Sequence, residues 1–345
     1  MFTNYLLLRR ISSWAAAVGA RLLGNRTRRL HPAVISDHFV FSKAPYAMSH
    51  ASTIAASGGV LVSAWFGGSL ESRPDVSIYV SINANGLWSE PVPVANGDQG
   101  NGVRYACWNP VLFPSLMGPL WLFYKVGESP RSWRGMCIIS NDSGRSWSKP
   151  QYLPDGVLGP AKNKPVQLTN NDLLSPCSTE NTGWQVYVER GNDPQGRWQQ
   201  IGPINDCKTI AAIQPSILRF GDGRLQLLCR TKQGRIAASW SSDDGATWSE
   251  MRLTALPNPN SGADALSLMD GRQLLVYNHS SRRRSPLNLA LSEDGGVWRR
   301  SLVLAQGPGE YSYPAVTQAA DGLIHVTYTW NLCRIRHVVI DPAQL

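Results

Sequence analysis

The chain has 345 residues, of which 43% are hydrophobic and only 17% charged, so it can bury a large core and is not a disordered chain. Its formal net charge is +9, but the body of the chain contains no basic run, which argues against a nucleic-acid partner. The six cysteines form no CxxC pair and no zinc-type spacing with histidine, so we expect no metal and no cofactor.

Residues 1–36 stand apart from the rest of the chain. Arg9 and Arg10 precede an apolar run of about ten residues, which is too short to span a membrane. This pattern is compatible with an export signal, with a basic amphipathic helix, and with a surface helix or disordered tail. We therefore expect no membrane span, and the sequence leaves open whether the protein is cytoplasmic or exported.

Residues 37–345 contain a repeat with a period near 50. In each unit a short apolar strand is followed by a turn such as Asp222-Gly223, by further short strands and by a tryptophan such as Trp248. Four short strands at this period are typical of a β-propeller blade. The predicted blades cover, in chain order, residues 49–95, 109–150, 164–202, 214–252, 264–303 and 313–341.

The last unit is one strand short. Strands are expected near 313–318, 323–330 and 335–340, and the missing outer strand is supplied by residues 37–41 near the start of the repeat region. Such a closure removes an open sheet edge. The predicted fold is therefore all-β, a six-bladed β-propeller of four-stranded antiparallel blades, which we expect to be a monomer.

Polar residues recur at one mouth of the predicted channel. The first strand of each blade lines the channel, and the end of the second strand lies on the same face. The aligned first-strand positions are His50, Asn109, Lys164, Gln214, Asp264 and Tyr313. The second strands end near Lys125, Arg230 and Asn278, with Glu180 at the matching place in blade three. Concave clusters of unlike polar groups predict a ligand site, whereas solvated strand caps are the alternative.

The opposite face carries a different motif. Residues 140–147 and 241–248 both read S-x-D-x-G-x-x-W. In such a turn the aspartate accepts backbone N–H bonds while the tryptophan packs between strands. The motif therefore indicates fold and not function.

These turns resemble Asp boxes, and with the six-fold repeat the chain resembles the sialidase (neuraminidase) superfamily over about residues 40–345. The resemblance implies a tyrosine nucleophile activated by a glutamate, an aspartate acid, and three arginines that bind the sugar carboxylate. It places Arg230 and Arg284 at the second and third arginines. It places the nucleophile at Tyr311 or Tyr313, and the acid at Asp75 or Glu71.

Two features depart from the family pattern. His50 stands where the first arginine is expected, and no glutamate precedes Gln214, so Glu180 or Glu310 would have to replace it. Three functions therefore stay open. They are an exo-acting sialidase, a propeller that cleaves uronate glycans as a hydrolase or lyase with His50 and Tyr313 as the acid–base pair, and a non-catalytic glycan-binding propeller.

Overall fold

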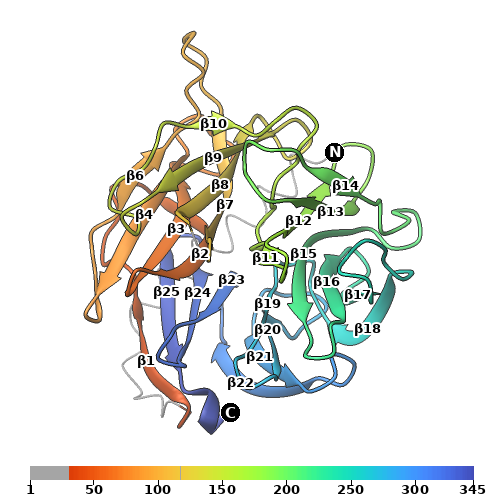
Figure 1. Ribbon diagram of the computed structural model, residues 1–345. Coiled ribbons are helices and arrows are strands. Elements are labelled where there is room, and N and C mark those ends of the chain that lie inside the picture. Colours follow the sequence, from red (N-terminus) through yellow and green to blue (C-terminus); the bar gives the residue numbers. More distant parts are fainter. Residues whose placement is uncertain (1–30, 117) are drawn as a thin grey trace.

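The computed structural model describes residues 31–116 and 118–345, and these residues form six antiparallel sheets around a central axis (Figure 1). Five sheets have four strands, and the first has a fifth strand because β6 also pairs with β4. The predicted fold class, a six-bladed β-propeller, is confirmed. The candidate export segment lies almost entirely outside the described residues.

The strands follow one another along the chain within each blade, with the closing strand as the exception. Blades one to three contain β2 (Met48–Ser57), β3 (Val60–Gly68), β4 (Ser77–Ala84), β5 (Leu87–Trp88), β6 (Val92–Ala95), β7 (Ala106–Pro114), β8 (Leu120–Gly127), β9 (Arg134–Ser140), β10 (Gln151–Tyr152), β11 (Val166–Gln167), β12 (Leu173–Thr179), β13 (Gln185–Gly191) and β14 (Gln199–Ile201). Blades four to six contain β15 (Ala212–Arg219), β16 (Leu225–Thr231), β17 (Arg235–Ser241), β18 (Arg252–Pro257), β19 (Asp264–Ser267), β20 (Gln273–Asn278), β21 (Leu287–Ser292), β22 (Arg299–Ala305), β23 (Tyr311–Gln318), β24 (Ile324–Trp330) and β25 (Arg334–Ile340), followed by a short 3-10 helix, η1 (Pro342–Gln344).

The propeller closes as predicted, with an N-terminal strand completing the last blade. Strand β1 (Val34–Phe39) pairs antiparallel with β25, and Figure 1 shows the two lying side by side. The strand begins three residues before the expected boundary at 37, so residues 34–36 belong to the propeller. The reason is that pairing continues to the end of β25, where Val34 lies opposite Ile340.

The core consists of apolar layers between neighbouring blades. Val62 and Ile78 of blade one pack in one cluster with Leu112 and Leu122 of blade two, and all four are at most 1% exposed. A single blade cannot bury both faces of its sheet, and the packing between neighbouring blades buries the second face. No helix among the described residues is long and apolar enough to cross a membrane.

The two S-x-D-x-G-x-x-W turns have the predicted hydrogen bonds. Asp142 accepts from the backbone N–H of Ser146 at 2.8 Å and from its hydroxyl at 2.6 Å, and Trp147 donates from its indole to the carbonyl of Gly144 at 3.0 Å. The turn at Asp243 repeats these contacts. Both turns connect the third and fourth strands of their blades, away from the ends of the second strands.

Three imidazoles form a chain across the closing blade. His337 on β25 lies between His325 on β24 and His38 on β1, with nitrogen–nitrogen distances of 3.1 and 3.3 Å. The indole of Trp88, from blade one, lies 3.2 Å from His337. Burial lowers the pKa of His337 to about 3, and burial also lowers the pKa values of the other two histidines.

We expect this chain of histidines to make the fold sensitive to acid. The pKa of His337 is depressed on folding, so its contribution to stability is present above pH about 6.5 and is lost as the pH falls toward 3. The loss is about 1.4 kcal/mol per pH unit for one such group. His337→Gln should therefore flatten the fall in unfolding free energy between pH 6.5 and 4, measured by denaturant titration. The exposed His31→Gln is the control, and equal slopes for His337→Gln and wild type would contradict the expectation.

Candidate functional site

A repeated β-bulge sets the position of the site residues. The inner strands β7, β15 and β23 each contain a bulge, and Asn109, Gln214 and Tyr313 occupy it with positive φ. In β2 the equivalent residue is Ala51, with φ 53°, and His50 precedes it. The predicted register is therefore correct for three blades, and it is wrong by one residue for His50.

The predicted register is also wrong for Lys164 and Asp264. In blades three, four and five the turn after the first strand is closed by a hydrogen bond from the N–H of Leu168, Phe220 and Leu268, respectively. Lys164, Ser216 and Asp264 each lie four residues before that N–H. Lys164 and Asp264 therefore match Ser216, two positions beyond the bulge. Counting back by two places Lys162, with φ 78°, at the position equivalent to Gln214.

Arg230 is the centre of a compact polar cluster. It lies on β16, and one terminal nitrogen, Nη1, donates to the hydroxyl of Tyr313 at 2.6 Å and to Oε1 of Gln214 at 3.0 Å. Its Nε donates to Oδ1 of Asn260 at 3.0 Å, and the guanidinium lies 5.3 Å from the ring centre of Trp184. The cluster thus joins blades four and six through one buried cation.

Arg284 approaches the same tyrosine from blade five. Its guanidinium lies 5.3 Å from the ring centre of Tyr313, and its Nη1 donates to Oε1 of Glu310 at 2.7 Å. Ser312 donates to the same carboxylate oxygen at 2.7 Å. Burial works against ionisation of Glu310, but the guanidinium of Arg284 lowers the pKa of Glu310 below its ordinary value. Tyr313 therefore lies against two arginines, one of which is paired with a carboxylate.

His50 reaches this cluster although it is out of register. Its ring centre lies 4.3 Å from that of Tyr313, and its Nδ1 lies 3.1 Å from the hydroxyl of Thr329. Burial lowers the pKa of His50 to about 3 against the opposing charge of Glu310. The imidazole is consequently neutral at neutral pH.

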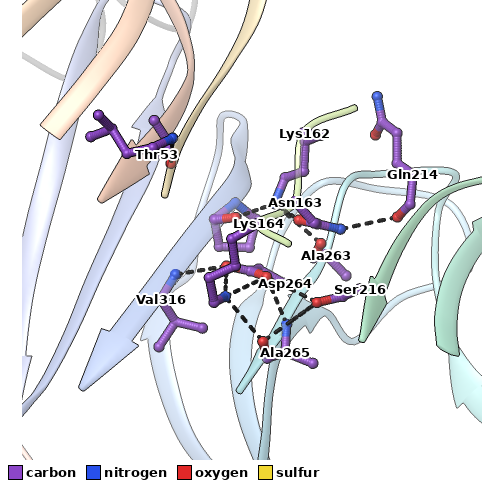
Figure 2. A network of polar contacts seen from close by, with 12 residues as sticks. Thr53, Lys162, Asn163, Lys164, Gln214, Ser216, Ala263, Asp264, Ala265 and Val316 are labelled. Carbon is purple, nitrogen blue, oxygen red and sulfur yellow. Dashed lines mark hydrogen bonds and ion pairs between the residues drawn. The ribbon is translucent and has the colours of Figure 1, made fainter. Parts of the chain in front are cut away.

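Lys164 and Asp264 form an ion pair with each other. Asp264 accepts from Lys164 at 2.9 Å, from the hydroxyl of Ser216 at 3.0 Å and from the backbone N–H of Val316 at 2.9 Å (Figure 2). These contacts join blades three, four, five and six beneath the site. The charges predicted to bind substrate at these two positions are used to hold the blades together.

Other predicted residues also make contacts within the protein. The ammonium of Lys125 binds the carbonyls of Leu158 and Gly159. The amide of Asn278 donates to the carbonyls of Pro286 and Tyr311, at 3.1 and 2.8 Å.

The structure separates the two candidate tyrosines. Tyr311 is 4% exposed, packs on Trp330 with ring centres 4.7 Å apart, and donates its hydroxyl to the carbonyl of Pro308 at 3.2 Å. Of the two, Tyr313 lies in the polar cluster. Regular alternation would place residues 311 and 313 on the same face of β23, and the bulge at Tyr313 breaks this alternation.

Three predicted residues, Asp75, Glu180 and Asn109, make no bond to this cluster within the described part of the chain. Asp75 follows β3 in an exposed loop, where its carboxylate accepts from the N–H and hydroxyl of Ser69 at 2.7 and 2.9 Å. Within residues 31–116 and 118–345, no hydrogen bond or ion pair joins Asp75, Glu180 or Asn109 to Arg230 or Tyr313. Their assignment to the site remains a prediction.

Sequence reasoning missed Lys162, Asn260 and Trp184. Lys162 could have been found by counting back from the turn at Asp172, whereas Asn260 and Trp184 lie in loops with no repeat marker. The described part of the chain contains no group of three or more His, Cys, Asp or Glu side chains that could hold a metal ion.

The fold is a six-bladed propeller, and its central polar cluster places Tyr313 against Arg230 and Arg284. Residues 59–326 match the BNR repeat-like domain family, and the chain belongs to this family within the sialidase-like superfamily. The match runs from the turn before β3 into β24, so it covers blades two to five in full and blades one and six in part.

The chain is also similar to a curated protein and to solved structures. It is 23% identical over 218 residues to an anhydrosialidase of Macrobdella decora, an alignment that spans 55% of this chain and only 28% of that protein. A crystal structure of a protein of unknown function from Dyadobacter fermentans has a TM-score of 0.74 at 16% identity, covering 90% of this chain and 99% of the other. The Hadza microbial sialidase Hz136 has a TM-score of 0.74 at 17% identity, and the alignment covers 86% of this chain and 66% of that protein. The two structures support the fold.

Proposed function

We propose that the protein is an exo-acting glycosidase of the sialidase type that releases a terminal acidic sugar from glycans. One observation carries this proposal, namely that Arg230 and Arg284 reach Tyr313 from two different blades. Two guanidinium groups at one mouth suit the carboxylate of an acidic sugar, which an arginine binds through two parallel hydrogen bonds. The distant similarity to an anhydrosialidase supports the same class of substrate.

In this proposal Tyr313 is the nucleophile. The phenol passes its proton to the carboxylate of Glu310 as its oxygen attacks the anomeric carbon, the glycosidic C–O bond breaks, and the leaving oxygen takes a proton from Asp75. In the second step water gives a proton to Asp75 and displaces the tyrosine, which takes its own proton back from Glu310. Arg230, which donates to the phenolic oxygen at 2.6 Å, stabilises negative charge on that oxygen. Asp75 would have to reach the leaving group from its exposed loop, where Ser69 now holds its carboxylate.

A uronate glycan is the second candidate substrate. The observation that favours it is the His50 ring 4.3 Å from Tyr313, at a site where Gln214 and not a carboxylate shares Arg230 with the tyrosine. In a lyase reaction Tyr313 would act as a phenolate stabilised by Arg230: it takes the C5 proton, the C4–O bond breaks, and the tyrosine hydroxyl passes that proton to the leaving oxygen, giving an unsaturated uronate. Because His50 is neutral at neutral pH, it would donate a hydrogen bond and not act as an imidazolium acid.

Arg230→Lys tests carboxylate binding at this mouth. An ammonium cannot reproduce the forked contacts of a guanidinium, so affinity for N-acetylneuraminic acid or glucuronic acid should fall by ~1.5–3 kcal/mol, the range for hydrogen bonds to charged groups. Isothermal titration calorimetry measures this change. Arg224→Lys, at the other end of the same strand pair, is the matched control and should bind like wild type. Unchanged affinity in a folded Arg230→Lys protein would refute the assignment.

A further inference from the structure

A buried lysine lies directly beneath the proposed site. Lys162 is 3% exposed, has a positive φ of 78°, and lies in the loop before β11, next to Asn163 (Figure 2). Its ammonium donates to Oδ1 of Asn163 at 2.9 Å, to the carbonyl of Ala263 at 3.1 Å and to the carbonyl of Pro314. An ammonium has three N–H bonds, and here each has an acceptor.

These acceptors connect Lys162 to the residues of the cluster. Pro314 directly follows Tyr313, so the lysine holds the bulge that presents the tyrosine. Asn163 donates from its amide to the carbonyls of Gln214 and Pro215, each at 3.0 Å, and so holds the equivalent bulge of blade four. Figure 2 shows Lys162, Asn163 and Gln214 in this arrangement.

The two bulges share a further partner, because Gln214 and Tyr313 both accept a hydrogen bond from the same nitrogen of Arg230. Gly262 leaves room for the Lys162 side chain and the Tyr313 ring. A Cβ at Gly262 would lie 3.2 Å from Cε of Lys162 and 3.3 Å from Cγ of Tyr313, so the lysine chain and the tyrosine ring pass close to the same glycine. A small movement of one bulge would therefore change the geometry at Arg230.

We propose that Lys162, acting through Asn163 and the Pro314 carbonyl, is a positioning residue that aligns Gln214 and Tyr313 on Arg230. This proposal rests on the proposed function for the reaction that the alignment serves, whereas the alignment itself rests on the contacts of Lys162 and Asn163. Lys162 binds backbone carbonyls of blades five and six, and Asn163 extends the contact to blade four. Removal of the ammonium leaves buried carbonyls without a donor, which favours a shift of the backbone around Tyr313.

The test compares Lys162→Met with Lys164→Met. Both remove a buried or half-buried ammonium from the same loop, but Lys164 binds Asp264 and the carbonyl of Ala265, not the bulges. The readout is the ¹⁹F spectrum of protein labelled with 3-fluorotyrosine, in which Tyr313→Phe identifies the Tyr313 signal. We expect this signal to shift or broaden in Lys162→Met and to keep its wild-type position in Lys164→Met.

Kinetics give a second readout if the wild type turns over an acidic glycoside. Lys162→Met should then lower kcat by about 10²-fold, as expected for a misplacement of about 1 Å, with KM changed much less. If the wild type shows no turnover, the proposed function fails while the fluorine spectrum still decides the positioning role.

A second variant covers the case in which Lys162→Met does not fold. Asn163→Ala removes the donors to Gln214 and Pro215 and should move the Tyr313 signal in the same direction by a smaller amount. A wild-type Tyr313 signal in either folded variant would overturn the proposal. Failure of both variants to fold, with Lys164→Met folded, would also overturn it, because the pair would then be required for assembly of the blades.

Discussion

Tyr313→Phe should lower the turnover of an acidic glycoside by ~10²–10⁴-fold, a range set by the loss of one positioned catalytic group. The change removes the phenolic oxygen, which accepts a hydrogen bond from Arg230 at 2.6 Å, and it keeps the ring that contacts His50 and Arg284. Steady-state kinetics measure the effect, and the melting temperature shows whether the fold is retained.

Tyr311→Phe is the matched control for this experiment. It removes a hydroxyl that donates to the carbonyl of Pro308 inside the core, so it should cost about 1 kcal/mol of stability with little effect on turnover. If Tyr311→Phe abolished turnover and Tyr313→Phe did not, the nucleophile would be assigned to the wrong tyrosine.

Asp264→Ala should destabilise the propeller by ~3–5 kcal/mol, the range for removing one partner of a buried ion pair. Asp264 is 3% exposed and accepts from Lys164, Ser216 and Val316, which come from three other blades. The change leaves the ammonium of Lys164 without its carboxylate and leaves a buried N–H without an acceptor. Denaturant unfolding measures the loss.

The double variant Lys164→Met, Asp264→Leu separates the two contributions. It removes the charge that Asp264→Ala leaves behind, so it should be more stable than the single variant. An unfolding free energy for Asp264→Ala equal to that of wild type would show that the network does not hold the blades together.

Much of the fold could be predicted because its signals are local. The turn at Asp222-Gly223 and the tryptophan at Trp248 depend on neighbouring residues, and both recur in other blades. The closing strand was found for a related reason, since a blade without an outer strand would expose an edge. Its start at Val34 was missed by three residues because pairing with β25, and not the local sequence, sets it.

The register of the site was harder to predict because a bulge adds one residue to the inner strand. In three blades proline follows the bulge residue and fixes the alignment, as in Gln214-Pro215. Blade one has Ser52 instead of proline, so its sequence does not distinguish Ala51 from His50 as the bulge residue. Blade three has two lysines around Asn163, and nothing local shows that the first of them occupies the bulge.

The use of each charge could not be predicted either. A polar residue at the start of an inner strand can bind either a ligand or another side chain, and in the second case its partner lies on a different blade, far away in sequence. Lys164 and Asp264 are 100 residues apart in sequence and bind each other in space. Arg230 and Arg284, which the sequence also selected, do lie together at Tyr313.

The most direct test of the central proposal is to incubate the protein with sialosides and with uronate oligosaccharides and to identify the products. The proposed function predicts release of free sialic acid from the sialosides, and its loss in Tyr313→Phe. An absorbing unsaturated uronate would instead assign a lyase. The proposal would be contradicted if folded protein released no product from either substrate class and also bound no acidic sugar by calorimetry.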